Sequence, residues 1–579
     1  MKASDFIARF LERKGISHVF ELSGGMITHL LDSLQQSTKI NIITMHHEQA
    51  AAFAADAFGR ISGLPGVALA TSGPGATNLL TGIGSCYFDS SPAIFITGQV
   101  NTHEQKRDRN IRQLGFQETD IVSMALPITK ASFRIEKAED IPEILEMAFS
   151  IPMEGRPGPV LIDIPMDMQR AAIQDDFLEN KDKQKEENPM TKTYLTEFGQ
   201  LANDIQTYKR PVILVGRGVR AAFAANEFSE FLELTGLPVI TSLLAVDAIP
   251  YKHKQRIGFI GSYGNRWANI AFGEADLIIV LGSRLDIRQT GADTKFFENG
   301  KKIYHVDCEE AEINNRIKGC VPIIGNVKDF LNIFNELFSN ENFLKKFAWF
   351  DYINELKKKW PDTKELNTAN NINPNKFIHL LSSHSENAAT FLADVGAHQM
   401  WTAQSIEINE GQTFITSAGM GAMGFALPAA VGACFANGKK PVVTIIGDGC
   451  MQLNLQELQT IIRNKIPVKI IVLNNQSLGM ITQFQASYFD ARYQSTYWGY
   501  SAPNFEKIAI AYGLAAKTIS KETEIVNAVE WLWNEENLHN PVLLQVMIAP
   551  FTNTYPKIAF GKPITEMEPF VKPIEMEGT

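Results

Sequence analysis

Polar residues follow two apolar runs in the last third of the chain, at a spacing that could hold a metal ion. A Gly-Asp-Gly triplet at residues 447–449 comes directly after the apolar run 442–446. After 24 further residues, an Asn-Asn pair at 474–475 follows the apolar run 468–473. Two buried parallel strands joined by a helix bring their carboxyl ends to the same edge of a sheet. The pattern therefore predicts that these acidic and amide groups lie together.

The chemistry of this predicted site favours a small, hard cation and a phosphate group. Asp448 offers a carboxylate, Asn475 an amide oxygen, and the turn at Ser477 a backbone carbonyl. Such oxygen ligands suit Mg²⁺, which also takes phosphate oxygens from a substrate or cofactor. Gly447 and Gly449 let the backbone approach those phosphates. An isolated Gly-Asp-Gly is usually a surface turn, but the flanking strands and the paired Asn argue against that here.

The long spacing from residue 447 to residue 475 resembles the diphosphate-binding motif of thiamine diphosphate enzymes. Further segments resemble the branch of that family that contains acetolactate (acetohydroxyacid) synthase. They are residues 47–50, 71–78, 116–120, 157–160, 423–425 and 427–430. Each short segment means little alone, but together they cover essentially the whole chain. The resemblance implies thiamine diphosphate and Mg²⁺ as cofactors.

The resemblance also implies which residues bind the cofactor and its metal. The glycine-rich stretch 419–424 is similar to the loop that contacts the aminopyrimidine ring, where the residue matching Met423 bends the cofactor. The segment 394–399 is similar to a diphosphate-side segment, with His398 as a phosphate donor. Without the resemblance, Met423 would be a routine core residue and His398 a structural histidine. The implied cofactor-binding residues are Gly25, Asn78, His398, Gly421, Met423, Gly447, Asp448, Gly449, Cys450 and Met480, and the implied metal ligands are Asp448, Asn475 and Ser477.

Glu48 is the first candidate for catalysis. Thiamine diphosphate must lose a proton from a ring carbon before it can act as a nucleophile, and a carboxyl group beside the aminopyrimidine ring promotes that loss. Glu48 precedes a helix predicted over the alanine-rich residues 50–57. A glutamate at a helix start often serves only the helix dipole, but the other motifs favour catalysis. Phe116 and Gln117 complete the predicted catalytic set as residues lining the acceptor pocket, and His47 is a further candidate.

The resemblance implies an assembly of subunits. In relatives, the matching glutamate and the diphosphate motif lie in different domains and meet across a subunit boundary. We therefore expect a homodimer or homotetramer with active sites at the subunit interface.

The middle of the chain carries two turns that could hold a flavin. Residues 216–218 (Gly-Arg-Gly) follow the apolar run 211–215, and residues 282–288 follow the run 276–281. Backbone amides and arginines in such turns can bind phosphate, although Gly-x-Gly alone is more often an ordinary strand-to-helix turn. The second turn resembles the flavin-associated segment of acetolactate synthases, where Leu285 and Ile287 replace the usual Phe and Asp. The implied FAD-binding residues are Gly216, Arg217, Gly218, Arg284, Asp286 and Arg288.

Several departures from the family pattern concern the second substrate. Phe484 stands where many acetolactate synthases carry Trp, and Met166 replaces a common Lys. A separate departure lies in the diphosphate-side segment, where Ala397 replaces a usual glutamine. The segment 102–113 is more basic than usual, with arginines that could equally form a solvated face; these are Arg107, Arg109 and Arg112. The departures leave open an acceptor other than a 2-keto acid, such as a nucleotide-linked ketosugar.

Alternating strand-like and helix-like segments predict an α/β fold of three doubly wound parallel-sheet domains. We expect a pyrimidine-binding domain over 1–172, a middle FAD/nucleotide-binding-like domain over 193–340, a diphosphate-binding domain over 373–560 and a C-terminal tail over 561–579. Polar linkers are predicted at 175–192 and 363–373. A length of 579 residues is too great for one core.

Composition narrows the class of protein. The net charge of -10 argues against nucleic acid or an anionic membrane as a partner. Five cysteines without CxxC spacing argue against a disulfide framework or a zinc site and favour a cytoplasmic location. The N-terminal residues lack the apolar core of a signal peptide, and no stretch is apolar for long enough to span a membrane.

The resemblance implies decarboxylation of pyruvate and transfer of the acetyl equivalent to a second carbonyl. With pyruvate as acceptor the product is acetolactate, and with a ketosugar it is a branched sugar. A flavin-dependent pyruvate oxidase is an alternative from another reaction class. A non-catalytic binding protein is a third, which the joint presence of Glu48, Asp448 and Asn475 disfavours.

Overall fold

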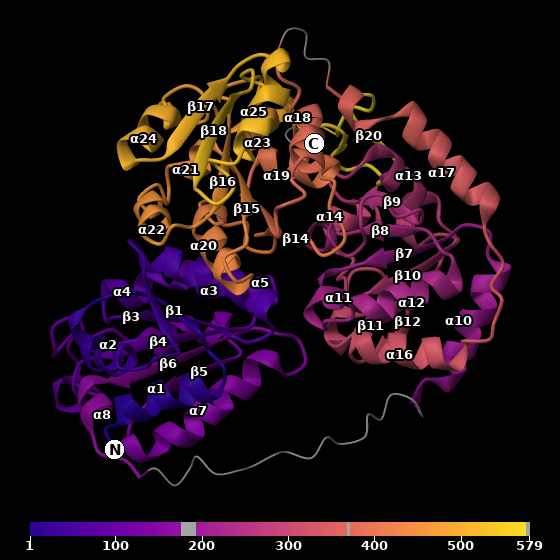
Figure 1. The fold of residues 1–579 in the computed structure, drawn as a ribbon. Coiled ribbons are helices and arrows are strands. Elements are labelled where there is room, and N and C mark those ends of the chain that lie inside the picture. The colour runs from indigo at the N-terminus through magenta and orange to yellow at the C-terminus, as the bar shows by residue number, and fades with distance from the viewer. Residues whose placement is uncertain (175–192, 367–370, 575–579) are drawn as a thin grey trace.

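Three α/β units follow one another along the chain, as predicted (Figure 1). The computed structural model describes residues 1–174, 193–366 and 371–574. Each unit is built on a six-stranded sheet in which every paired strand is parallel. The predicted fold class is therefore confirmed.

The first sheet has the strand order β2-β1-β3-β4-β6-β5. Its strands are β1 (His18–Leu22), β2 (Asn41–Thr44), β3 (Gly66–Ala70), β4 (Ala93–Gln99), β5 (Ala131–Arg134) and β6 (Pro159–Pro165). The helices are α1 (Ala3–Arg13), α2 (Thr28–Gln35), α3 (Glu48–Ser62), α4 (Pro74–Asn78), α5 (Leu80–Phe88), α6 (Ile121–Ala125), α7 (Ile141–Ser150) and α8 (Met166–Arg170). Along β3, Val67 and Leu69 join one hydrophobic core while Ala68 and Ala70 join another, so helices cover both faces of the sheet.

The third sheet has the order β14-β13-β15-β16-β18-β17, which repeats that of the first when its strands are renumbered from one. Its strands are β13 (Thr390–Ala393), β14 (Thr413–Thr416), β15 (Val442–Gly447), β16 (Val468–Asn474), β17 (Ala515–Ile519) and β18 (Val542–Met547). The helices are α18 (Pro374–Ser383), α19 (Ala397–Ser405), α20 (Ala426–Ala436), α21 (Asp448–Met451), α22 (Glu457–Arg463), α23 (Gly479–Tyr488), α24 (Phe505–Tyr512) and α25 (Ile525–Leu532). The first and third units thus share a topology without a visible sequence repeat.

The middle sheet has a different order, β12-β11-β10-β7-β8-β9, which is the arrangement of dinucleotide-binding folds. Its strands are β7 (Pro211–Val215), β8 (Val239–Thr241), β9 (Arg256–Phe259), β10 (Leu277–Leu281), β11 (Lys302–Asp307) and β12 (Val321–Ile324). The helices are α10 (Leu195–Thr207), α11 (Arg217–Ala221), α12 (Ala225–Thr235), α13 (Arg266–Glu274), α14 (Ile287–Thr290), α15 (Thr294–Glu298) and α16 (Val327–Leu337), followed by α17 (Phe347–Lys359).

The predicted C-terminal tail packs on the middle unit in its described part. β20 (Met567–Glu568) pairs antiparallel with β19 (Lys557–Ile558). The guanidinium of Arg266 donates to the backbone oxygens of Met567 and Glu568 at 3.3 and 3.0 Å. Ile564 is buried in the same core as the helix that carries Arg266.

The structure describes part of one predicted linker and none of the other. The first, 175–192, lies outside the described residues. In the second, residues 362–364 form a 3₁₀ turn and Asn373 caps α18 by accepting from the amides of Asn375 and Lys376, while 367–370 lie outside the described residues. Within the described ranges, no helix is long and apolar enough to cross a membrane.

One hydrophobic core is shared between the first and third units. The alanine-rich helix α3 lies against α20, and Figure 1 shows them side by side with α5 at the boundary between indigo and orange. Small side chains on both helices allow this close approach: a Cβ added to Gly432 would lie 1.9 Å from the backbone oxygen of Ala54. This contact fixes the first unit on the third.

Candidate active site

The predicted metal ligands gather at the carboxyl ends of β15 and β16. Asp448 is the first residue of α21, directly after β15, and Asn475 and Ser477 follow β16. All three side chains are buried. In the described part of the chain, the Oδ2 of Asp448 and the Oγ of Ser477 have no hydrogen-bond partner. Buried oxygens without partners are costly, so this donor set fits a bound cation.

His398 lies next to this edge of the sheet and also has an unpartnered atom. A Cβ added to Gly447 would lie 2.6 Å from the His398 ring, so only glycine lets the strand end pack against it. Burial lowers the pKa of His398 to about 3, so the ring is neutral at pH 7. Its Nε2 is buried and has no partner among the described residues. The other ring nitrogen donates to the Asp394 backbone oxygen, so Nε2 can donate to a phosphate oxygen once the ring takes up a proton, which a neighbouring diphosphate favours.

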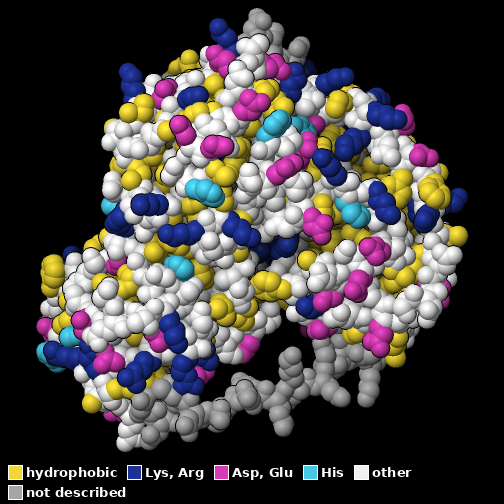
Figure 2. Space-filling view, in the orientation of Figure 1, with side chains coloured by type: hydrophobic (Ala, Val, Ile, Leu, Met, Phe, Trp, Pro, Cys, Tyr) yellow, Lys and Arg dark blue, Asp and Glu magenta, His cyan; other side chains and the backbone are white. Residues whose placement is uncertain are grey.

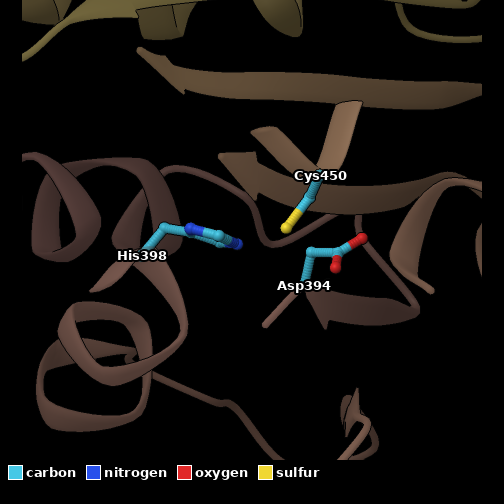
Figure 3. A group of neighbouring side chains, drawn as sticks. All are labelled: Asp394, His398 and Cys450. Atoms are coloured by element: carbon cyan, nitrogen blue, oxygen red, sulfur yellow. The ribbon is translucent and has the colours of Figure 1, made fainter. Parts of the chain in front are cut away.

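His398, Asp394 and Cys450 form a buried cluster whose ligand atoms lie within 4.8 Å of one another (Figure 3). A metal in this cluster is disfavoured by its chemistry. The Asp394 carboxylate accepts from the amides of Val395, Gly424 and Ala426 at 2.8 to 2.9 Å, which occupies its oxygens. Burial raises the pKa of the Cys450 thiol well above its usual value, whereas a metal ligand must be a thiolate. The cluster therefore shapes the backbone around the diphosphate site.

The predicted aminopyrimidine segment, residues 419–424, lies in the loop 417–425 between β14 and α20, which passes close to the Gly-Asp-Gly turn. A Cβ on Gly449 would lie 3.4 Å from the Cε of Met423 and 3.4 Å from the hydroxyl of Tyr500. Met423 therefore lies beside the turn that carries Asp448, and Gly421 lies two residues before it in the same loop. Burial raises the pKa of Asp448 to about 7, with the Gly449 amide and the Tyr500 hydroxyl opposing the shift.

Two further predicted cofactor contacts lie at element starts. Gly25 begins a 3₁₀ turn (Gly25–Ile27) after β1, and a Cβ on it would meet nothing within 4 Å. Met480 lies at the start of α23 and packs against the core beneath the third sheet. Met480 is thus near the Asn475 turn, whereas Gly25 belongs to the first unit.

The predicted catalytic residues gather in the first unit. Glu48 is buried and accepts a hydrogen bond from the Asn78 side chain at 2.9 Å. A Cβ on Gly75 would lie 3.2 Å from the Glu48 Oε1, and one on Gly73 would lie 3.0 Å from the Cβ of Gln117. Gln117 and Glu48 therefore both lie against the 71–78 segment.

His47 and Phe116 are the remaining candidates near Glu48. α3 begins at Glu48 itself, two residues earlier than predicted, because His47 caps the helix by accepting from the Gln49 amide at 3.0 Å. Phe116 adjoins Gln117 but is 80% exposed, so in a single chain it lines no closed pocket. The capping bond uses the Nδ1 atom of His47.

The two groups of residues belong to different units of the chain. Glu48 lies in the first unit, where its carboxylate accepts from Asn78, whereas Asp448, Asn475 and Met423 lie in the third.

Glu457 is a residue beside this site that the sequence did not reveal. It belongs to α22 of the third unit, yet its buried carboxylate accepts from the amide of His46 at 3.0 Å, two residues before Glu48. Burial raises the pKa of Glu457 to about 7, opposed by Thr460 and the His46 amide. No sequence spacing links residues 411 positions apart.

A cavity of about 420 Å³ lies where the three units meet. It is lined by the turns after β7 and β10, by residues 88–90 and 155–157 of the first unit and by Ala418 and Gly419 of the third. Figure 1 shows α5, α11, α14 and β14 around this centre, and Figure 2 shows the surface hollowed between the first and middle units. Figure 2 also shows acidic and basic side chains interspersed over this face.

The predicted flavin-binding residues surround this cavity. Arg217, Gly218, Arg284, Asp286 and Arg288 line it. Gly216 lies one residue before Arg217 and packs against the opposite turn. A Cβ on Gly218 would lie 2.6 Å from the Cα of Gly282, so the two turns approach closely.

The charged side chains of the cavity differ in what they do. Arg217 has a buried Nε without a partner in the described chain, and burial, followed by the charge of Arg60, lowers its pKa to about 10. Asp286 caps α14 by accepting from the amides of Arg288 and Gln289. The unpartnered guanidinium nitrogen fits an anionic ligand in the cavity.

Comparisons with known proteins agree with this geometry. Residues 1–124 match the family described as thiamine pyrophosphate enzyme, N-terminal TPP binding domain; residues 199–334 match the central domain and residues 394–546 the C-terminal TPP binding domain. The chain belongs to the acetolactate synthase large-subunit family of thiamine pyrophosphate enzymes. Within this family, Glu48 and Gln117 lie in the N-terminal domain and Asp448 and Asn475 in the C-terminal one.

Individual relatives match along nearly the full length of this acetolactate synthase family member. A protein of Methanocaldococcus jannaschii named probable acetolactate synthase large subunit is 37% identical over 100% of this chain and 96% of its own. The acetolactate synthase large subunit of Corynebacterium glutamicum is 35% identical over 98% of this chain and 90% of its own. Acetolactate synthase 3, chloroplastic, of Brassica napus is 36% identical over 97% of this chain and 85% of its own.

Proposed function

We propose that the protein decarboxylates pyruvate with thiamine diphosphate and joins the acetyl equivalent to a second carbonyl compound. The observation that carries the proposal is the set of buried, unpartnered oxygen and nitrogen atoms of Asp448, Ser477 and His398 at one sheet edge, in a chain of this family. When bound, thiamine diphosphate supplies a nucleophilic ring carbon and a thiazolium ring that accepts the electron pair freed by decarboxylation.

The metal site binds Mg²⁺ in this proposal. Asp448, Asn475 and a backbone oxygen near Ser477 would hold the cation, and His398 would donate to a diphosphate oxygen. The donors are hard oxygens at the end of a buried strand, which suits Mg²⁺ shared with phosphate. Met423 and the backbone of Gly421 would hold the aminopyrimidine ring.

Glu48 would hold and release the proton that activates the cofactor. The Asn78 amide donates to one of its oxygens at 2.9 Å, which leaves the other oxygen for the ring nitrogen of the cofactor. Because Glu48 and the metal ligands lie in different units of one chain, we propose that the active site forms between two copies, in a homodimer or homotetramer. Glu48 would then serve the cofactor held by the partner subunit.

The cavity at the junction would hold FAD. Its volume of about 420 Å³ lies in the range of cofactor pockets, and the unpartnered Arg217 Nε fits a diphosphate group. The cavity lies at the carboxyl ends of a sheet with dinucleotide-binding strand order. Arg284, Asp286 and Arg288 would complete the contacts at its rim.

The acceptor would enter beside Gln117 and Phe116. The exposed phenyl ring of Phe116 would be covered once a second copy completes the pocket. Pyruvate itself is the simplest acceptor and would give acetolactate. An anionic ketosugar is the second candidate because the exposed guanidinium groups of Arg107, Arg109 and Arg112 lie on the segment that leads to Gln117.

Substitution of Glu48 tests the proposal. In Glu48→Gln we expect thiamine diphosphate to bind with nearly wild-type affinity, while turnover of pyruvate falls by about 10²-fold or more because proton transfer is lost. Calorimetric titration measures the first and a pyruvate-consumption assay the second.

The matched control is Glu146→Gln, an exposed glutamate paired with Lys14 at 2.7 Å in the same unit. It is expected to retain wild-type turnover. Near-normal turnover of Glu48→Gln would remove Glu48 as the activating group.

A further inference from the structure

A cluster of buried charges joins helix α3 to the third unit. The Arg60 guanidinium donates to both oxygens of Asp56, at 2.5 and 2.9 Å, and to Asp89 at 3.1 Å. The three side chains are almost completely buried. Although burial disfavours the charged guanidinium, Asp56 and Asp89 raise the pKa of Arg60 above its usual value, so the ion pairs persist at neutral pH.

The cluster also makes hydrogen bonds to the backbone at the start of the loop 417–425. The Asp89 carboxylate accepts from the Gly419 amide at 2.7 Å and from the Ala418 amide at 3.1 Å. Arg60 donates to the backbone oxygen of Thr416 at 2.9 Å. Asp89 is more than 300 residues away from these partners in the sequence.

The other end of the same loop is held by a second buried aspartate. Asp394 accepts from the amides of Gly424 and Ala426 at 2.9 and 2.8 Å. The loop is thus fixed at both ends by carboxylates, and Met423 lies between them. Loss of either carboxylate would leave buried backbone amides without partners.

Stability alone does not explain three buried charges. Buried ion pairs contribute little net stability because desolvation offsets their attraction, so apolar residues could fill the same space. What the charges supply is a fixed geometry, since a bidentate guanidinium and two carboxylates allow few arrangements. In this cluster, the charges fix the geometry of the loop backbone.

We propose that Asp89, oriented by Arg60 and Asp56, is a positioning residue that sets the loop 417–425 for thiamine diphosphate. The inference rests on the proposed function. Because α3 begins at Glu48 and carries Asp56 and Arg60, the same cluster fixes the helix of the proposed proton-transfer residue. The loop and the helix are therefore set relative to each other by one buried contact.

Asp89→Asn tests the inference, because the amide nitrogen must face either Arg60 or the Gly419 amide, each of which is also a donor. We expect the dissociation constant of thiamine diphosphate, measured by calorimetry with Mg²⁺ present, to rise about tenfold. At saturating thiamine diphosphate, kcat should fall by a smaller factor than the affinity does, because no reacting group has changed. Hydrogen exchange of the amides at 418–419 should quicken.

Asp247→Asn is the matched control. Asp247 is also buried, pairs with Arg220 at 3.2 Å and accepts from the Phe414 amide at 3.0 Å, but this amide belongs to β14 and not to the loop. We expect this variant to lose thermal stability while it binds thiamine diphosphate like wild type.

Arg60→Lys is the second variant, should Asp89→Asn not fold. This variant keeps the positive charge but loses the bidentate geometry of the guanidinium. It should therefore weaken thiamine diphosphate binding, as Asp89→Asn does. Wild-type affinity in the Asp89 and Arg60 variants, or an equal loss in Asp247→Asn, would overturn this inference alone. A wild-type protein that does not bind thiamine diphosphate would overturn the proposed function and this inference with it.

Discussion

At the scale of single residues, the site depends on polar atoms that the chain leaves buried without partners. Asp448, Ser477 and His398 each carry such an atom, and all three lie after or beside strand ends of the third sheet. A chain that folds in this way keeps these groups ready for a ligand, because binding supplies the missing hydrogen bonds or metal contacts.

Asp448→Asn is expected to weaken the metal site without disturbing the fold. The amide keeps the size of the side chain but removes the charged ligand, so the Mg²⁺ concentration for half-maximal activity should rise by about 10- to 100-fold. Titration of Mg²⁺ at fixed thiamine diphosphate measures the shift. An unchanged Mg²⁺ requirement would place the cation elsewhere.

Some of these residues could be predicted from sequence and others could not. Asp448 and Asn475 follow apolar runs, and strand ends meet at one sheet edge, so a local pattern is enough. The same rule would also have found Asp394, which follows β13. Glu457 and Asp89 act on backbone amides 411 and 330 residues away, and no local periodicity encodes such a contact.

At the scale of elements, the strand order distinguishes the first and third units from the middle unit. Alternation of apolar runs and amphipathic segments predicted three parallel sheets, because each buried strand reads as a continuous apolar run. The order of strands could not be predicted, since it depends on which helix crosses to which face. α3 begins at Glu48, two residues before the predicted start, because the His47 ring caps it. Residue type alone does not predict this side-chain contact.

Helix α18 is held by a histidine between two carboxylates. The ring nitrogens of His379 lie 2.9 Å from Asp362 and 2.9 Å from Glu407. Burial alone would lower the pKa of His379, but the two carboxylates outweigh it and raise the pKa to about 9. Tyr251, Arg256 and Lys357 also lie near this group.

This pairing predicts a dependence of stability on pH. Because the folded pKa is raised above the usual 6.5, the contribution should be complete below about pH 6.5 and lost as pH rises through about 9. The melting temperature of His379→Gln should therefore lie below that of wild type at pH 6 and approach it at pH 9.5. A difference that is constant across this range would show that His379 is uncharged.

At the scale of the whole molecule, the three units meet around one cavity and share contacts through buried side chains. α3 and α20 form a common core, Asp247 joins the middle unit to β14, and Arg156 of the first unit pairs with Glu312 of the middle unit at 2.7 Å. A ligand in the cavity would touch all three units at once. Composition predicted several domains but gave no sign of this junction.

The most direct measurement follows the carbon of pyruvate. Purified protein with thiamine diphosphate and Mg²⁺ is incubated with pyruvate alone and then with a second carbonyl compound, and products are identified by mass spectrometry. The account predicts release of carbon dioxide and a product with a new carbon–carbon bond, acetolactate from two pyruvates, and loss of both when the cofactor is omitted. Unconsumed pyruvate, or oxygen uptake that yields acetate without a new carbon–carbon bond, would contradict it.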